Sequence, residues 1–138
     1  MKISSTYTIA LQLLIICKHY NTEKITSNFI AKQTGADAGL IRRIMVDLKN
    51  NGIIDSKPGP GGIKLNKDLD EITLYDLYSA VTDEDESVLK FSNTSKSISS
   101  FDDKIKNTAN KCFSGYISSF FKELKNHTVG DIYRKTLE

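Results

Sequence analysis

The sequence predicts a mainly α-helical fold with one small β-hairpin, in which a winged helix-turn-helix is followed by a long C-terminal helix. Three observations predict this fold. Two short helical segments meet at Gly35, a proline- and glycine-rich segment follows at 57–64, and an apolar stripe with helical spacing runs from about 102 to 126. Helix, tight turn, helix and hairpin, in that order, match a helix-turn-helix with its wing.

The first predicted helix is unusually apolar. Ser4 or Ser5 can cap a helix that runs to about His19. Residues 9–17 are almost continuously apolar, which is more than one face of a surface helix needs. We therefore expect this helix to be covered on more than one side.

The next two helices are bounded by capping residues. Thr26 or Ser27 can cap a short helix that ends at Gly35, and Asp37 can cap a longer one. Apolar residues recur at intervals of three and four in the longer helix, which ends at 50–52 with a glycine in the left-handed manner.

The segment 57–64 predicts the tip of a hairpin. It holds both prolines of the chain and three of its eight glycines, and short apolar runs stand on either side at 53–54 and 63–65. Proline stiffens the backbone, and glycine lets the backbone come close to another molecule. Lys57 and Lys64 flank the tip, so we expect a stiff, cationic wing.

The second half of the chain contains two more helices before its end. Thr73 can cap a helix that carries apolar residues on one face as far as Val81. The connection that follows is acidic and then serine-rich, and it is long enough to be a sensor loop or a linker. Thr128 can cap a last short helix. We therefore divide the chain into a DNA-binding domain at 1–82, a linker at 83–101 and a dimerisation unit at 102–138.

The long helix predicted from Asp102 or Asp103 to about Asn126 would extend roughly 33 Å. A body of about 80 residues cannot cover such a helix, so a second copy of the chain is the simplest cover, although a core helix within one protomer remains an alternative. The predicted interface residues share the apolar stripe of this helix: Ile105, Ala109, Cys112, Tyr116, Ile117, Phe120, Phe121 and Leu124.

Charge is divided unevenly along the chain. Residues 1–67 hold ten Lys/Arg and four Asp/Glu, whereas residues 68–138 hold nine and thirteen, so net charges of +6 and −4 make up the total of +2. The basic half suits a polyanion, although chance clustering on a solvated face is an alternative. No secretory signal or apolar run of membrane-spanning length is evident, and two distant cysteines form neither a disulfide framework nor a zinc motif. We expect a cytoplasmic protein without membrane contact or a metal site.

These features predict a surface for double-stranded DNA. In a helix-turn-helix, the N-terminal part of the second helix enters the major groove. Arg42 and Arg43 can then reach phosphates or base edges, although on their own they could equally form a solvated helix face. The predicted DNA contacts from the helices and the wing are Thr26, Asp37, Ala38, Leu40, Arg42, Arg43, Lys57, Gly59, Gly61, Gly62 and Lys64.

Several segments also carry a resemblance to a known family: Met1-Lys2-Ile3-Ser4, Ile30-Ala31 with Gly35, Leu40-Ile41-Arg42-Arg43-Ile44 with Leu48, Lys49-Asn50-Asn51-Gly52-Ile53-Ile54, Gly59-Pro60-Gly61-Gly62, and Glu71-Ile72-Thr73-Leu74-Tyr75-Asp76-Leu77 with Ala80-Val81. The chain resembles the Rrf-two family of bacterial winged-helix regulators, which includes IscR, NsrR and CymR. The resemblance implies a homodimeric regulator, with repression as the expected action, on a pseudo-palindromic operator. It also implies phosphate contacts from Ser4 and Tyr7.

The chain departs from the cluster-binding members of that family. Those members carry three closely spaced cysteines before the long helix, whereas residues 83–103 contain none. We therefore expect no iron–sulfur cluster or other cofactor, and the chain resembles the cluster-free, YwnA-like branch. Cys112 is either a small buried residue of the apolar stripe or a redox-active thiol, and an unknown small-molecule or redox effector remains possible.

The sequence also bears on two other function classes. A winged helix can also dock proteins, so a protein–protein interaction module without DNA affinity is the alternative function. No glycine-rich phosphate loop occurs in the right context, and no nucleophile stands beside a His–acid pair in the sequence. We therefore expect that the protein is not an enzyme.

Overall fold

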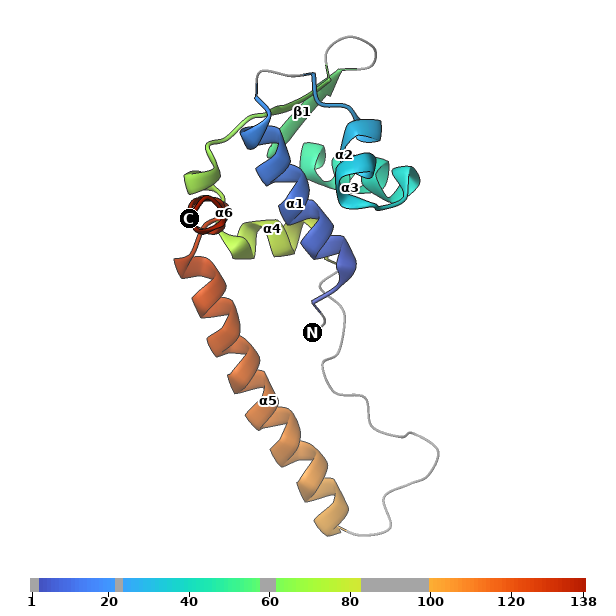
Figure 1. Cartoon of the computed structure of the whole chain (residues 1–138). Coiled ribbons are helices and arrows are strands. Elements are labelled where there is room, and N and C mark those ends of the chain that lie inside the picture. The colour runs from blue at the N-terminus through green and yellow to red at the C-terminus, as the bar shows by residue number, and fades with distance from the viewer. Residues whose placement is uncertain (1–2, 22–23, 58–61, 83–99) are drawn as a thin grey trace.

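The computed structural model describes residues 3–21, 24–57, 62–82 and 100–138 (Figure 1). Its elements, in chain order, are α1 (Ser5–His19), α2 (Ser27–Thr34), α3 (Ala38–Asn50), β1 (Ile54–Lys57), β2 (Gly62–Leu65), the 3₁₀ turn η1 (Leu69–Glu71), α4 (Leu74–Val81), α5 (Ser100–Asn126) and α6 (Val129–Thr136). This confirms the predicted fold class, a mainly helical protein with one two-stranded hairpin and a long C-terminal helix.

Five of the helices begin at the capping residues that the sequence predicts. The side-chain oxygens of five N-cap residues accept hydrogen bonds from backbone N–H groups of the first turn, which would otherwise lack partners. These residues are Ser4, Thr26, Asp37, Thr73 and Thr128. The last two form full capping boxes, because the side chains of Asp76 and Asp131 accept hydrogen bonds from the N-cap backbone in return.

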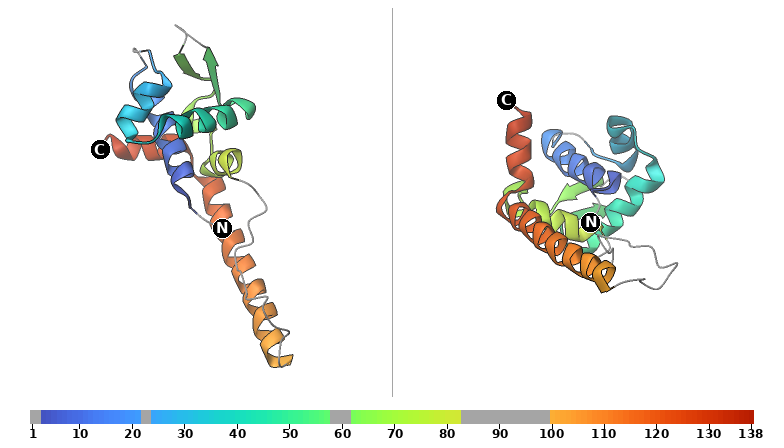
Figure 2. Two further views of the ribbon diagram at one scale, coloured as in Figure 1. Left: turned by 90° about the vertical axis from the view of Figure 1, so that its right-hand side faces the viewer. Right: turned by 90° about the horizontal axis from the view of Figure 1, so that it is seen from below.

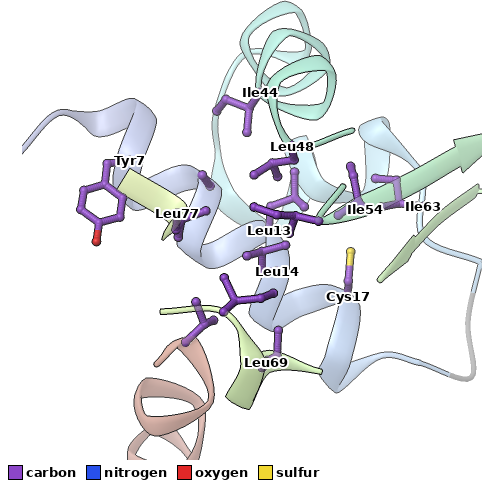
Figure 3. Packing of buried hydrophobic residues seen from close by; sticks show 14 of the residues in the cluster. Tyr7, Leu13, Leu14, Cys17, Ile44, Leu48, Ile54, Ile63, Leu69 and Leu77 are labelled. Atoms are coloured by element: carbon purple, nitrogen blue, oxygen red, sulfur yellow. The ribbon is translucent and has the colours of Figure 1, made fainter. Parts of the chain in front are cut away.

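Helix α1 lies at the centre of the protein. Its residues Ala10, Leu13 and Leu14 have no exposed surface, and the helix contacts α2, α3, α4, α6, β2 and η1. Figure 3 shows Leu13 and Leu14 between the side chains of the helix-turn-helix and those of η1 and α4. The expectation that this helix is covered on more than one side is confirmed.

The hairpin extends the helix-turn-helix. Gly35, with φ of 73°, ends α2 and lets the chain turn into α3. Strands β1 and β2 then pair antiparallel, with Ile54 opposite Leu65 and Lys57 opposite Gly62. The tip at 58–61, including the predicted contacts Gly59 and Gly61, lies outside the described residues.

Helix α5 extends away from the body, as Figures 1 and 2 show from three directions. It begins at Ser100, two residues before the predicted start, and has 27 residues. Among the described residues, α5 packs on the body through its C-terminal end: the ring of Phe121 lies 5.3 Å from those of Tyr75 and Tyr78, and Leu124 is 9% exposed. Phe121 and Leu124 were predicted to face a second copy, but their apolar surface is used within the protomer.

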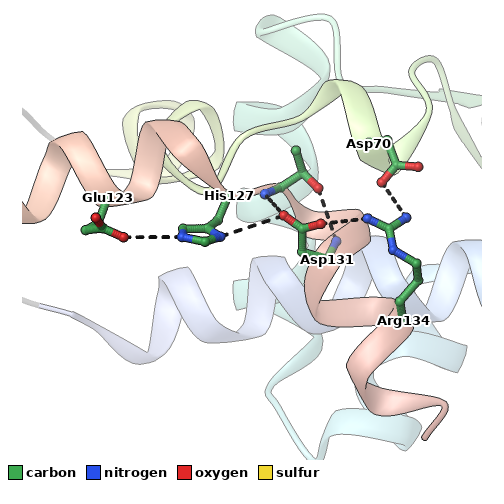
Figure 4. A network of polar contacts seen from close by, with 6 residues as sticks. Asp70, Glu123, His127, Asp131 and Arg134 are labelled. Atoms are coloured by element: carbon green, nitrogen blue, oxygen red, sulfur yellow. Dashed lines mark hydrogen bonds and ion pairs between the residues drawn. The ribbon is translucent and has the colours of Figure 1, made fainter.

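A backbone joint connects α5 and α6 to the body. The N–H of Leu74 donates a hydrogen bond to the carbonyl of His127, and the N–H of Val129 donates one to the carbonyl of Ile72. The N···O distance is 2.9 Å in each. Arg134 adds ion pairs of 2.6 Å with Asp70 and Asp131 (Figure 4). These contacts hold α6 beside η1. No helix within the described ranges combines the length and apolarity needed to cross a bilayer.

Tyr7 belongs to the core rather than to a DNA-binding surface. It is 7% exposed, its hydroxyl donates to the carbonyl of Leu74 over 2.6 Å, and its ring packs edge-on against Tyr78. Burial, with a smaller contribution from Tyr78, raises the pKa of Tyr7 to about 12. The hydroxyl is therefore not available for the phosphate contact that the family resemblance implied.

Replacing Tyr7→Phe is expected to lower the free energy of unfolding by about 1 kcal/mol, because the carbonyl of Leu74 loses a buried donor. Urea denaturation measures this change. Tyr20→Phe is the matched control, since its hydroxyl has no hydrogen bond within the described part of the chain. Equal stability of the Tyr7→Phe variant and the unmodified protein would contradict the assignment.

Candidate nucleic-acid interface

A cationic cleft lies between the hairpin and the helix-turn-helix. It has a volume of about 350 Å³, and its cations are Arg42, Lys49 and Lys57. We call it the wing cleft. The rest of its lining consists of Ile25, Thr26, Ser27, Met45, Ser56, Gly62 and Ile63. Of the predicted DNA contacts, it brings together Thr26, Arg42, Lys57 and Gly62.

Lys49 is a cleft residue that the sequence analysis missed. Its ammonium group donates to the carbonyl of Ser56 over 3.3 Å, which connects α3 to β1. Lys49 follows Arg42 by seven residues, which is two helical turns, so both lie on one face of α3. This seven-residue spacing could have identified Lys49 from the sequence as a neighbour of Arg42 on the same helix face.

Some residues in the first half of α3 are exposed to solvent, whereas others cap the helix or pack against the core. Arg43 is exposed but does not line the wing cleft, and Val46, one turn further on, is 55% exposed. Asp37 accepts a hydrogen bond from Leu40 N–H over 3.2 Å, so its carboxylate is already used as a cap. Ala38 and Leu40 are half-buried, and Leu40 packs against the core.

A second cationic hollow lies on the other side of the Ile25–Ile63 contact. It has a volume of about 340 Å³, and its cations are Lys18, Lys24 and Lys64. We call it the outer hollow. Neither hollow is lined by an acidic residue among those that the structure describes. Lys57 and Lys64 line different hollows, but both also line a small pocket with Asp55 on the exposed face of the hairpin. Cations therefore lie in both hollows, and one carboxylate lies beside the two hairpin lysines.

One backbone hydrogen bond holds the hairpin in place between the two hollows. Ile63 N–H donates to the carbonyl of Ile25 over 2.8 Å. Gly62 stands just before Ile63 with φ of 65°, and a Cβ atom there would lie 2.8 Å from the same carbonyl oxygen. Glycine at this position therefore permits both the backbone angle and the close approach.

Ser4 does not join these cationic groups. Its hydroxyl accepts from Tyr7 N–H at the N-terminal end of α1, and that end lies far from the hairpin in Figure 1. The structure therefore brings the residues of α2, α3 and the hairpin together, but it leaves Ser4 and Tyr7 apart from them.

The family comparison agrees with this geometry. A family model described as "Rrf2: Iron-dependent Transcriptional regulator" matches residues 3–135, nearly the whole chain. The chain belongs to the Rrf2 family. It is therefore an HTH-type transcriptional regulator and not an enzyme, as the resemblance to the Rrf-two family implied.

Two curated relatives are from Bacillus subtilis (strain 168). "Putative HTH-type transcriptional regulator YwgB" is 32% identical over 83 residues, which cover 59% of this chain and 53% of YwgB. The match to this relative thus spans about half of its length. "Putative HTH-type transcriptional regulator YwnA" is 26% identical over 130 residues, which cover 94% of this chain and 96% of YwnA.

Solved structures of Rrf2 type share the fold. A transcriptional regulator from Lactobacillus plantarum superposes with a TM-score of 0.81 at 19% identity, covering 96% of this chain and 90% of that one. T. potens IscR superposes with a TM-score of 0.71 at 17% identity, and the match covers 99% of this chain and 88% of IscR. CymR (YrzC), the global cysteine regulator of B. subtilis, gives 0.69 at 18% identity and covers 97% of both chains.

The cysteines of this chain do not fit an iron–sulfur cluster. The sequence contains only two, and such clusters are held mainly by several cysteine thiolates. Cys17 is buried in the core, where burial raises the pKa of its thiol to about 12. Cys112 is exposed on α5 in the protomer, and its burial in the stripe between two copies stays a prediction. Among the described residues, no three His, Cys, Asp or Glu side chains cluster as metal ligands would.

Replacing Gly62→Ala is expected to destabilise the protein more than Gly52→Ala. Both glycines have positive φ, so each alanine costs about 1 kcal/mol of backbone strain. Only at Gly62 would the methyl group also meet the carbonyl of Ile25, whereas the space at Gly52 is open. The hydrogen bond of Ile63 should then be lost.

Urea denaturation and amide hydrogen exchange at Ile63 measure these effects. Faster exchange at Ile63 is expected only in Gly62→Ala. Equal destabilisation of the two variants, with Ile63 protected in both, would show that the hairpin is not held by this contact.

Proposed function

We propose that this chain binds a pseudo-palindromic DNA operator as a homodimer and represses transcription by covering promoter DNA. The observation that carries this proposal is the arrangement of cations on both sides of the hairpin: Arg42, Lys49 and Lys57 in the wing cleft, and Lys18, Lys24 and Lys64 in the outer hollow. Clustered Lys and Arg side chains bind duplex DNA by neutralising phosphates. Since DNA is the proposed partner, we place the protein in the cytoplasm.

The two helices of the motif have different roles in this proposal. The N-terminal half of α3 enters the major groove, where Arg42 and Arg43 contact base edges or phosphates. The N-terminus of α2 lies against a phosphate, because Thr26 is exposed enough to donate its hydroxyl and the first backbone N–H groups of a helix attract anions. The phosphate contacts orient the protein, and the base contacts give sequence preference.

The hairpin extends the contact along the duplex. Lys57 ends β1, Lys64 lies in β2, and both side chains are exposed on one face of the hairpin beside Asp55, so the wing can present two cations to the phosphates. Lys18 and Lys24 add positive charge beside β2. The region 1–82 thus acts as the DNA-binding unit in this proposal, with 83–101 as the linker.

The unit 102–138 pairs two protomers. Between Phe101 and Phe120, α5 exposes large apolar side chains to solvent, among them Ile105 at 50% and Tyr116 at 64%. With Ala109, Phe113 and Phe120 they recur at intervals of three and four residues, which forms a stripe along one side of the helix. A second α5 covers this stripe in the proposed dimer, with Cys112 and Ile117 at its edges.

Replacing Arg43→Ala is expected to weaken binding to an operator selected from a random duplex library by about 1–3 kcal/mol. The reason is the loss of a base or phosphate contact from the exposed face of α3. Fluorescence anisotropy at several salt concentrations measures the change.

The matched control is Lys104→Ala, which removes one exposed cation from α5. Its affinity and salt dependence should equal those of the unmodified protein. Unchanged binding by the Arg43→Ala variant would remove Arg43 from the interface. Failure of the unmodified protein to select any duplex would favour a protein-docking role instead.

Replacing Tyr116→Glu is expected to shift the protein from dimer to monomer, because a charge would enter the centre of the proposed apolar interface. Sedimentation equilibrium measures the mass. Ser118→Glu, on the same helix but off the stripe, is the control and should remain dimeric. A dimer of unchanged stability in Tyr116→Glu would exclude this face of α5 as the interface.

A further inference from the structure

A third hollow lies on the opposite flank of α1, away from both cationic hollows. It is a groove of about 530 Å³ between α1, the end of α2 and α6, and we call it the α1–α6 groove. Its apolar floor comes from Leu11, Ile15, Ile16, Ile132 and Leu137, and the remaining lining is Gln12, His19, Tyr20, Gln33, Tyr133 and Thr136. A volume of this size matches the pockets that hold small molecules.

The groove explains an excess of apolar residues on α1. The core already takes Ala10, Leu13 and Leu14 from the inner side of the helix. Ile15 and Ile16 lie on its other flank and are only half-buried, although isoleucine gains from complete burial. The second apolar side of this helix packs partly against the core, and the part that stays uncovered lines an open groove.

The lining chemistry indicates an uncharged occupant. None of the lining residues is Lys, Arg, Asp or Glu, which contrasts with the three cations of each hollow beside the hairpin. The polar groups are two amides, one hydroxyl, two phenols and one imidazole. Such a set can hydrogen-bond a neutral molecule, but it offers no counter-charge for an ion.

Aromatic rings gather at one end of the groove. The ring of His19 lies edge-on to Tyr20, with centroids 4.9 Å apart, and edge-on to Tyr133 at 6.0 Å. His19 Nδ1 and the hydroxyl of Tyr133 are 3.1 Å apart, so a hydrogen bond joins α1 to α6 across the groove. A flat aromatic ligand can add its ring to this cluster in the same edge-to-face manner.

The groove stands between the two units that DNA binding must coordinate. One wall is α1, which packs directly on α2, α3 and β2. The other wall is α6, which follows α5 directly through the N-cap residue Thr128. Arg134 of α6 forms an ion pair with Asp70 of η1 (Figure 4). A molecule that contacted both walls would therefore touch the helix-turn-helix support and the C-terminal helices at once.

We propose that the α1–α6 groove is a regulatory site for a small, uncharged aromatic molecule that carries a hydrogen-bonding group. The regulation rests on the proposed DNA-binding function, whereas the binding itself does not. Occupancy of the groove is therefore measured first without DNA, so that failure of this site and failure of DNA binding are distinguishable.

The experiment is a titration of the full, ¹⁵N-labelled chain with indole, followed by amide NMR spectra. Saturable shifts are expected at α1 and α6 residues around the groove, with a dissociation constant on the order of millimolar, as suits a ligand of so few atoms. Benzoate and benzylamine, which carry opposite charges, should bind at least tenfold more weakly. Equal binding of the charged probes, or no saturable shift with indole, would overturn the proposal.

Gln12→Trp tests the location, because it places a large side chain at an exposed position of the groove lining. It should weaken indole binding at least tenfold. Thr8→Trp, also exposed on α1 but outside the lining, is the matched control and should bind indole normally. Equal indole binding by the two variants would place the site elsewhere.

A second copy of the chain is the competing occupant. In that case the groove resonances would shift with protein concentration and not with indole, which would contradict the proposal. A final anisotropy titration with the selected operator should show at least a threefold change in DNA affinity when indole saturates the groove. Indole binding without any such change would overturn the regulatory role.

Discussion

The burial of α1 is the constraint on which the rest of the structure depends. Leu13 and Leu14 have no exposed surface, and each such side chain contributes roughly 1.5–3 kcal/mol when it is fully buried. Because α1 contacts the helix-turn-helix, β2, α4 and α6, it is the common support of the winged helix-turn-helix and the C-terminal helices. The position of α6 depends on it as well, since Val129 packs into the same core.

The cationic surface follows from a few backbone contacts on that support. The hydrogen bond between Ile63 and Ile25 places the hairpin beside α2, with cations on each side of it. Lysine and arginine side chains can cluster in this way because no acidic residue lines either hollow within the described ranges and because DNA would neutralise them. The same fold leaves the opposite flank of α1 uncharged, so the two sides suit ligands of different chemistry.

The features that could be predicted from the sequence are those set by residues close together in the chain. Caps such as Thr73 and Thr128 act within one helical turn, and the glycine at 35 needs only its own backbone angle, so these features could be found without the fold. The burial of Tyr7 and Leu124 within the protomer could not be predicted. An apolar stripe on a helix does not indicate which of its residues pack in the protomer's own core and which face a partner. The α1–α6 groove was also invisible, since α6 follows α1 by more than a hundred residues.

The central claim is that two protomers present the cationic surface around the hairpin to duplex DNA. Hydroxyl-radical footprinting of the protein on its selected operator tests this most directly. The account predicts two equivalent sets of protected sugars, related by two-fold symmetry and centred a whole number of helical turns apart, with protection extending outward where each hairpin lies. A single unpaired footprint, or full protection by a variant whose hairpin lysines have been replaced, would contradict it.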